Sequence, residues 1–286
     1  MNTLAKRNRI LIYPALIWFL VFFILPLSII FIYSIATNYL FAGKTVHITI
    51  KNFLLIFQQR YYFIILLRSL KISLFTTIFS IIFSYPVAYF LAKKTKFDKV
   101  LIVVLMIPFW INYLIRIFAW KLILSENGII NQLLMWSGII HEPLKMLYTQ
   151  TSVVLGLIYT YTPMMVLPIY ASILKIDNSL TEAALDLGAS RASAFFDITF
   201  KLSLTGIFAG TLLVFIPALG SFAIPAILGG TDSVMIGNMI ENQFIHVGNW
   251  NFGSAFTIAL AVLSIAMILF YSRIFGLESI YRNREF

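Results

Sequence analysis

The chain of 286 residues contains no cysteine and few charged residues. Without cysteine it cannot form disulfides or thiolate metal sites. The three histidines, His47, His141 and His246, are too far apart in the sequence to suggest a metal-ligand spacing, so we expect no metal site. Charged residues make up only 11% of the chain and hydrophobic residues 60%, whereas about 25% of an ordinary soluble domain is charged. This composition is typical of an integral membrane protein.

Carboxylates are also missing from the interior of the long apolar stretches. All 11 acidic residues lie in loops or at the ends of those stretches. A membrane-embedded enzyme requires buried titratable groups. A channel requires a selectivity ring or a voltage-sensing arginine repeat, and the sequence has neither. We therefore expect no catalytic residue, and an enzyme or a channel is a poorly supported alternative of a different class.

Six apolar stretches reach or approach the length of about 20 residues with which a helix crosses the hydrocarbon layer. They are Ile10–Ile35, Ser69–Ala92, Val100–Phe118, Thr151–Leu174, Leu202–Leu228 and Phe252–Ser272. The first is too long for a cleaved signal peptide, so we expect a retained helix. The fold class predicted is an all-α membrane protein with six transmembrane helices.

The third stretch has the weakest pattern, because Arg116 and Lys121 interrupt its end. We expect this end to bend into an interfacial segment that includes Trp120, Trp136 and Tyr148, since tryptophan and tyrosine favour the headgroup level. Arg116 is expected to extend its side chain towards the same interface.

Lysine and arginine predict the orientation. The short loop Lys93–Lys99 holds four lysines, and such a loop stays in the cytoplasm. Both termini are then cytoplasmic. The net charge of +10 comes from residues that flank apolar stretches and form no continuous basic stripe, so we expect no nucleic-acid partner. No linker-like tract or internal repeat divides the chain, which predicts one transmembrane domain over residues 1–286.

One cytoplasmic segment, residues 177–201, differs from the other loops. Ser179 and Glu182 have capping-box spacing, which predicts a helix beginning at Ser179. Gly188 can adopt the left-handed conformation that ends a helix, and Ser190 can cap a second one. We call residues 177–201 the coupling segment, for the role proposed for it below.

The first helix of the coupling segment offers a smooth face formed by Ala183 and Ala184. Leu180, Leu185 and Leu187 flank this face. Such a surface fits into a groove of another protein. The alternative is that the leucines rest on lipid or on neighbouring helices, and periodicity does not separate the two.

The coupling segment resembles the EAA motif of permease subunits of bacterial ABC importers. Glu182, Ala183 and Ala184 are followed after three residues by Gly188 and after nine more by Ile198, as in that motif. Phe200, Lys201 and Thr205 replace a leucine and two prolines of the pattern, which leaves open where the surface helix ends and the fifth span begins. Over nearly the whole chain the sequence is similar to spermidine/putrescine permeases. The stretches that carry this similarity are Ser84–Ala92, Pro108–Arg116, Glu182–Ser190 and Ile236–Asn238.

The resemblance implies a type I ABC importer permease fold in a bacterial inner membrane. It also implies that this chain is not itself an enzyme, and that Glu182, Ala183, Ala184, Leu185 and Gly188 dock on an ATPase. The partners implied are two copies of that ATPase, a second homologous permease, an extracytoplasmic polyamine-binding protein and membrane lipid. The alternative within the family is an importer of another small solute.

No cofactor site is expected in this chain, so ATP and Mg²⁺ would bind the partner ATPase. Gly43-Lys44-Thr45 matches only the end of a phosphate-binding loop, because Asn38 stands where its first glycine belongs.

A pathway for polyamines should offer aromatic faces to their ammonium groups. The aromatic residues within or beside the predicted spans include Trp110, Tyr113, Tyr159, Tyr161 and Phe222, which we take as candidate pathway residues. The alternative for each is packing between helices or against lipid. Four carboxylates of the outer loops, Glu126, Glu142, Asp232 and Glu241, could attract a cation or contact a binding protein.

Overall fold

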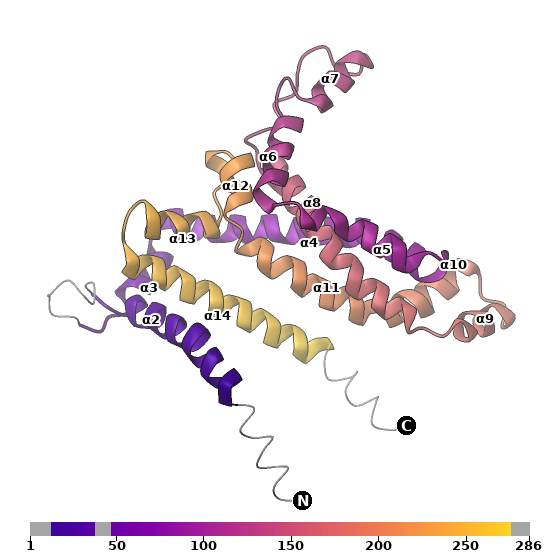
Figure 1. Cartoon of the computed structure of the whole chain (residues 1–286), viewed down its shortest axis with the longest axis horizontal. Coiled ribbons are helices and arrows are strands. Elements are labelled where there is room, and N and C mark those ends of the chain that lie inside the picture. The colour runs from indigo at the N-terminus through magenta and orange to yellow at the C-terminus, as the bar shows by residue number, and fades with distance from the viewer. Residues whose placement is uncertain (1–12, 38–46, 276–286) are drawn as a thin grey trace, which may run out of the picture. The chain divides into compact units, whose positions relative to one another are not determined.

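A computed structural model describes residues 13–37 and 47–275, which form helices joined by turns (Figure 1). The one isolated antiparallel bridge among these residues joins Ala36 and Ile48. The predictions made for the N-terminal helix before residue 13, for Gly43–Thr45 and for the two chain ends lie outside the described residues. The expectation of an all-α protein is confirmed for the part described.

The helices alternate between long elements and short connecting ones. A helix from Tyr13 to Ser34 includes α2 (Leu25–Ser34). It is followed by α3 (Lys51–Gln58), α4 (Arg60–Lys93), α5 (Asp98–Met106), α6 (Tyr113–Ile123), α7 (Ile129–Trp136), α8 (Gln150–Leu174), α9 (Asn178–Asp186), α10 (Arg191–Ala194), α11 (Lys201–Leu219), α12 (Ala223–Leu228), α13 (Ile236–Ile245) and α14 (Trp250–Phe275).

Among the described residues, five helices are long and apolar enough to cross a membrane. They are Tyr13–Ser34, Arg60–Lys93, Gln150–Leu174, Arg191–Leu219 and Trp250–Phe270. A sixth span exists only if Asp98–Trp110 and Tyr113–Ile123 are counted together, and these two segments meet at 86°. The count of six therefore depends on a broken helix.

The break in the third predicted span comes earlier than its charged residues indicated. A 3₁₀ turn at Ile107–Trp110 contains Pro108, and Ile111 is extended. Asn112 then begins a new helix, because its side-chain oxygen accepts a hydrogen bond from the Leu114 amide at 2.9 Å. The bend predicted near Arg116 is real, but local capping at Asn112 sets its place.

Three other predicted boundaries were wrong. The second span begins at Arg60, nine residues earlier than predicted, because arginine is a good helix former and neither Arg60 nor Arg68 interrupts the helix. The fifth ends at Leu219 and not at Leu228, because Gly220 ends the helix and a separate α12 follows. The fifth also begins at Arg191: a π-helical turn at Phe195–Phe200 joins α10 to α11 without a break.

The described chain forms two compact units, and the larger comprises residues 64–238 and 266–275. Within it α8 and α11 lie side by side (Figure 1). Gly206 and Gly210 permit this approach: a Cβ at Gly206 would lie 2.4 Å from the Pro168 carbonyl oxygen, and one at Gly210 would lie 2.4 Å from the Met165 sulfur. This pair of small residues thus packs against a helix of the same chain.

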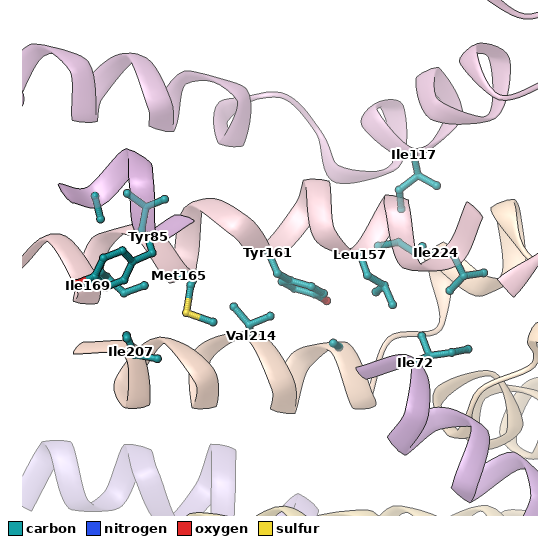
Figure 2. Close-up of a cluster of buried hydrophobic side chains, with 14 of the residues drawn as sticks. Ile72, Tyr85, Ile117, Leu157, Tyr161, Met165, Ile169, Ile207, Val214 and Ile224 are labelled. Carbon is teal, nitrogen blue, oxygen red and sulfur yellow. The ribbon is translucent and has the colours of Figure 1, made fainter. Parts of the chain in front are cut away.

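The core of the larger unit fills the space between these helices. Figure 2 shows Tyr161 and Met165 on α8 directed towards Val214 and Ile207 on α11. Hydrogen bonds join the same helices to α4. Ser84 Oγ donates to the Thr162 carbonyl at 3.0 Å, and the Tyr85 and Ser203 hydroxyls lie 3.0 Å apart.

The smaller unit comprises residues 13–37, 47–63 and 239–265 of the described chain. Two asparagine amides bind backbone carbonyls at the C-terminal end of α2 and just beyond it. Asn52 Nδ2 donates to Ser34 and Ala36, and Asn251 Nδ2 donates to Tyr33 and Ala36, at 2.9–3.2 Å. Phe256 packs edge to face with both Tyr62 and Phe252 beside this end, and the rings of Tyr62 and Phe252 are tilted towards each other.

Candidate functional site

The coupling segment begins with a helix cap that differs from the predicted one. Helix α9 starts at Asn178, and the Asp177 carboxylate accepts a hydrogen bond from the Ser179 amide at 3.0 Å. The capping box of Ser179 and Glu182 was therefore wrong, because Asp177 already has the extended backbone of an N-cap. The hydrogen bond from the Ser179 amide lowers the pKa of the Asp177 carboxyl.

The end of α9 follows the prediction closely. Gly188 has φ +88°. The Ala189 amide donates to the Ala184 carbonyl at 3.0 Å and the Gly188 amide to the Leu185 carbonyl at 2.9 Å, which is the hydrogen-bond pattern of a Schellman motif. Ser190 then caps α10 by accepting from the Ser193 amide at 3.1 Å. Helix, glycine turn and second helix are confirmed.

The first helix of the coupling segment is left uncovered by the rest of the chain. No residue of α9 is buried. Glu182, Ala183 and Leu185 are exposed, Ala184 is half-buried and Leu187 is 90% exposed. The leucines thus do not pack into the core of their own subunit, which leaves lipid or another protein as the surface that covers them.

Lys93 ties the coupling segment to α4, a role that sequence reasoning missed. Its ammonium group donates to the Ile176 carbonyl at 2.7 Å and to the Asn178 side-chain oxygen. The sequence presents Lys93 only as one of four lysines that mark a cytoplasmic loop. No local pattern reveals its partners, which lie more than 80 residues away.

A second link lies at the same ends of the helices. The Tyr170 hydroxyl on α8 donates to the Asp98 carboxylate at the start of α5 at 2.5 Å. Asp98 therefore joins two helices of the larger unit and is not simply a loop charge.

The five candidate pathway residues do not form one cluster. Tyr161 is buried, donates to the Pro217 carbonyl at 3.3 Å and lies beside Tyr113. Tyr159 packs edge to face on Trp120, with ring centroids 5.4 Å apart. Part of the ring surface of Tyr113, Tyr159 and Tyr161 is therefore used in packing between helices, as the alternative to a pathway role expects.

Trp110 and Phe222 differ from the other three. Trp110 is 83% exposed, and the Phe222 side chain is also exposed. The backbone around Phe222 is held, because Asn238 Nδ2 donates to its carbonyl. Both rings can therefore meet a solute, lipid or a partner protein.

Arg116 lies in a place that the sequence did not predict. It is 9% exposed and does not extend to an interface. Its guanidinium carbon lies 5.0 Å from the ring centroid of Phe109 and 6.0 Å from that of Tyr113, within cation–π range. Arg116 and Tyr159 line a pocket of about 370 Å³, whose other walls are mostly apolar.

A larger cavity of about 670 Å³ lies between the end of α6 and the start of α8. Its lining includes one carboxylate, Glu126, and one ammonium group, Lys145. The Lys121 ammonium group lies over the ring of Tyr148, which also lines the cavity. Because its lining carries both a negative and a positive side chain, this cavity has no clear preference for a cation.

Comparison with known proteins identifies the class. Residues 81–277 match the family model of the binding-protein-dependent transport system inner membrane component. The chain belongs to this family: it is a multi-pass inner-membrane permease subunit of a binding-protein-dependent ABC importer, and is not itself catalytic.

Two individual relatives within this family are permeases of spermidine/putrescine transport systems. The chain is 38% identical over 274 residues to the spermidine/putrescine transport system permease protein PotB of Salmonella typhimurium (strain LT2), covering 96% of this chain and 95% of the relative. It is 43% identical over 213 residues to PotB of Escherichia coli K12, covering 74% and 78%. The resemblance seen in the sequence is confirmed.

A solved structure shows the fold independently. The chain matches one chain of the crystal structure of a bacterial alginate ABC transporter in complex with alginate pentasaccharide-bound periplasmic protein. The TM-score is 0.72 at 19% identity, with 94% of each chain covered. The helices therefore follow the arrangement of an ABC importer permease.

Proposed function

We propose that this chain is one of two homologous permease subunits of an ATP-driven importer that carries spermidine and putrescine into the cytoplasm. The names and the identity of the PotB relatives support this substrate class. The other partners are two copies of an ATPase, which bind ATP and Mg²⁺, and an extracytoplasmic polyamine-binding protein. This chain supplies six spans of a type I permease in one transmembrane domain, with both termini in the cytoplasm.

The uncovered helix α9 is the observation that carries the docking part of the proposal. Glu182, Ala183, Ala184 and Leu185 lie on a helix with no buried residue, and Gly188 ends that helix in a fixed turn. A rigid helix with a small-residue face suits insertion into a groove of the ATPase. The helix is held by its own caps, so it can keep its shape while it moves with the partner.

Motion of α9 has two direct routes into the membrane. Lys93 connects the start of α9 to α4, and the turn at Gly188 leads into the unbroken helix Arg191–Leu219. ATP binding would close the ATPase dimer and favour the outward-open state of the permease. Such a switch requires that ATP bind the two states with different affinity, because a ligand with equal affinity for both shifts neither.

Uptake by the reconstituted complex tests the substrate. Labelled spermidine and putrescine should accumulate only with ATP and the binding protein, whereas alginate fragments and an unrelated amino acid should not. A complex with an ATPase subunit that cannot hydrolyse ATP is the control. Uptake of an unrelated solute in preference to both polyamines would overturn the proposed substrate while leaving the permease class intact.

The topology has a separate test in this cysteine-free chain. Lys96→Cys should resist an impermeant thiol reagent added from outside the cell, whereas Glu142→Cys should react, because the lysine-rich loop is cytoplasmic. The reverse pattern of labelling would contradict the proposed orientation.

A further inference from the structure

The pocket beside the bend between α5 and α6 contains a positive charge that no residue of the described ranges 13–37 and 47–275 neutralises. Arg116 is buried, and its Nε has no hydrogen-bond partner. Within the residues that the structure describes, no acceptor for the guanidinium is found, and its contacts are the rings of Phe109 and Tyr113. A guanidinium stays charged in proteins and presents five donors.

No carboxylate of the described chain can serve as the counter-ion. Asp98, the acid on α5, is engaged by Tyr170. The ion pairs among the described residues are Lys201 with Asp197 and Glu241 with His246. A buried charge with no partner is strongly unfavourable, and aromatic faces replace only part of the lost solvation. The residues that the structure describes therefore supply no partner for Arg116.

The depth of the pocket in the membrane shows whether lipid or a protein can supply the partner of Arg116. Phe83, on its α4 wall, lies ten residues before Lys93, which is about 15 Å along a helix. Tyr159 and Pro163 lie near the middle of α8. The hydrocarbon layer is about 30 Å thick, so the pocket is near its centre. Lipid phosphates lie at the edge of the layer, and acyl chains accept no hydrogen bond.

We propose that this pocket is a docking site for a carboxylate side chain of the second permease subunit, which pairs with Arg116 when the two permeases assemble. The inference rests on the proposed function, because it requires that second subunit. A carboxylate matches the fork of the guanidinium with two parallel hydrogen bonds. The apolar walls exclude water from the pair, and the pocket of about 370 Å³ accommodates the side chain with its neighbours.

Photo-crosslinking in the purified complex tests which molecule occupies the pocket. The probe, p-benzoylphenylalanine, replaces Leu105, which lines the pocket. In the matched control it replaces Val104, which is exposed on the same helix outside the pocket. Mass spectrometry should find an adduct with the second permease from position 105 and none, or a lipid adduct, from position 104. Adducts from position 105 with lipid alone, or with a second copy of this chain, would overturn the proposal.

Charge exchange tests the pairing. Arg116→Gln should lower the yield of the second permease co-purified with this chain at least about tenfold, since it leaves a carboxylate buried without a partner. Lys121→Gln, which removes the other cation of α6, should leave the yield unchanged. In a charge exchange, Arg116→Glu in this chain is combined with an arginine in the second permease, in place of the acidic residue nearest the crosslink. This combination should restore assembly. If charge exchange restores assembly at none of the acidic residues near the adduct, the proposed ion pair is wrong. If Arg116→Gln does not fold, the crosslinking experiment decides by itself.

These readouts do not depend on transport. A position-105 adduct with the second permease in a complex that takes up no polyamine would refute the proposed substrate and keep the docking site. Normal polyamine uptake without that adduct would refute the docking site alone.

Discussion

The coupling segment and the broken helix from Asp98 to Ile123 use the same local device. Each stops one helix, turns the chain and starts a second helix with a side-chain cap, Ser190 in the first and Asn112 in the second. They differ in what surrounds them. Helix α9 buries nothing, whereas α6 buries Arg116 and Ile117.

This difference shows which interactions hold each region. Backbone hydrogen bonds within a few residues fix the shape of α9, so its surface remains free for another protein. Contacts with residues distant in the sequence fix α6, so a substitution there also disturbs the packing of α12 and of Tyr159 on α8. Substitutions can test the contrast in both regions, and the effects below are ordered from the largest to the smallest.

The contrast is sharpest between two glycines. Gly206→Leu should abolish or severely reduce the folded protein, because even a Cβ at Gly206 would lie 2.4 Å from the Pro168 carbonyl oxygen in the backbone of α8. Overpacking costs about 1–3 kcal/mol or more. Membrane extraction and a fluorescence-detected gel filtration profile measure the result. The control is Ala209→Leu, which adds the same side chain at an exposed position of the same helix. A normal profile for Gly206→Leu would contradict the close helix approach.

Gly188→Val should leave the permease folded and uncouple it from ATP. Space does not limit this position, since a Cβ would meet nothing within 4 Å, but φ is +88°. A non-glycine residue there costs about 1–2 kcal/mol, and a β-branched one costs more. Polyamine uptake should fall at least about tenfold with normal expression. Gly188→Asn, which tolerates this conformation, should retain most uptake. Equal loss in both variants would show that the turn conformation is not the cause.

Lys93→Met should weaken the link between α4 and α9 without unfolding either helix. Two hydrogen bonds are lost, at a net cost of about 1 kcal/mol each. We expect ATPase activity to persist in the complex while uptake per ATP falls several-fold. Lys94→Met, which removes an exposed lysine without such contacts among the described residues, is the control. Loss of uptake in both variants would point to the charge of the loop and not to the link.

Trp110→Ala should have the smallest effect. Its ring is 83% exposed, so this subunit loses little packing. If the ring meets a polyamine, the loss of one cation–π contact of about 0.5–2 kcal/mol should slow uptake of spermidine and putrescine alike. Uptake of each polyamine, measured separately with assembly checked, tests this expectation. Reversal of the preference between them would show that this subunit selects the substrate.

Features fixed by local contacts were predicted from the sequence more accurately than features fixed by contacts with distant residues. The turn at Gly188 and the cap at Ser190 were predictable because each depends on neighbours within five residues. The place of the bend at Asn112 was missed, since charge at Arg116 and Lys121 drew attention away from a capping side chain. The burial of Arg116 and the partners of Lys93 depend on helices distant in the sequence, and no local pattern encodes them.

The candidate pathway residues illustrate the same limit. Hydropathy and aromatic content select Trp110 and Tyr161 equally. Packing separates them, because Tyr161 lies in the core with its hydroxyl on the Pro217 carbonyl and Trp110 projects from the chain. The presence of an aromatic residue in an apolar stretch does not show whether its ring contacts the protein core, lipid or a solute.

The π-helical turn at Phe195–Phe200 sets the rotation between the two parts of the helix from Arg191 to Leu219. Its 29 residues span about 43 Å, longer than the hydrocarbon layer of about 30 Å, so one rod reaches from the coupling segment through the membrane. A π turn carries one extra residue relative to an α-helix. That residue offsets the two halves of the rod by roughly 100° about its axis. If α9 transmits motion of the ATPase as proposed, this angular offset sets the direction of the push within the membrane together with the docking surface.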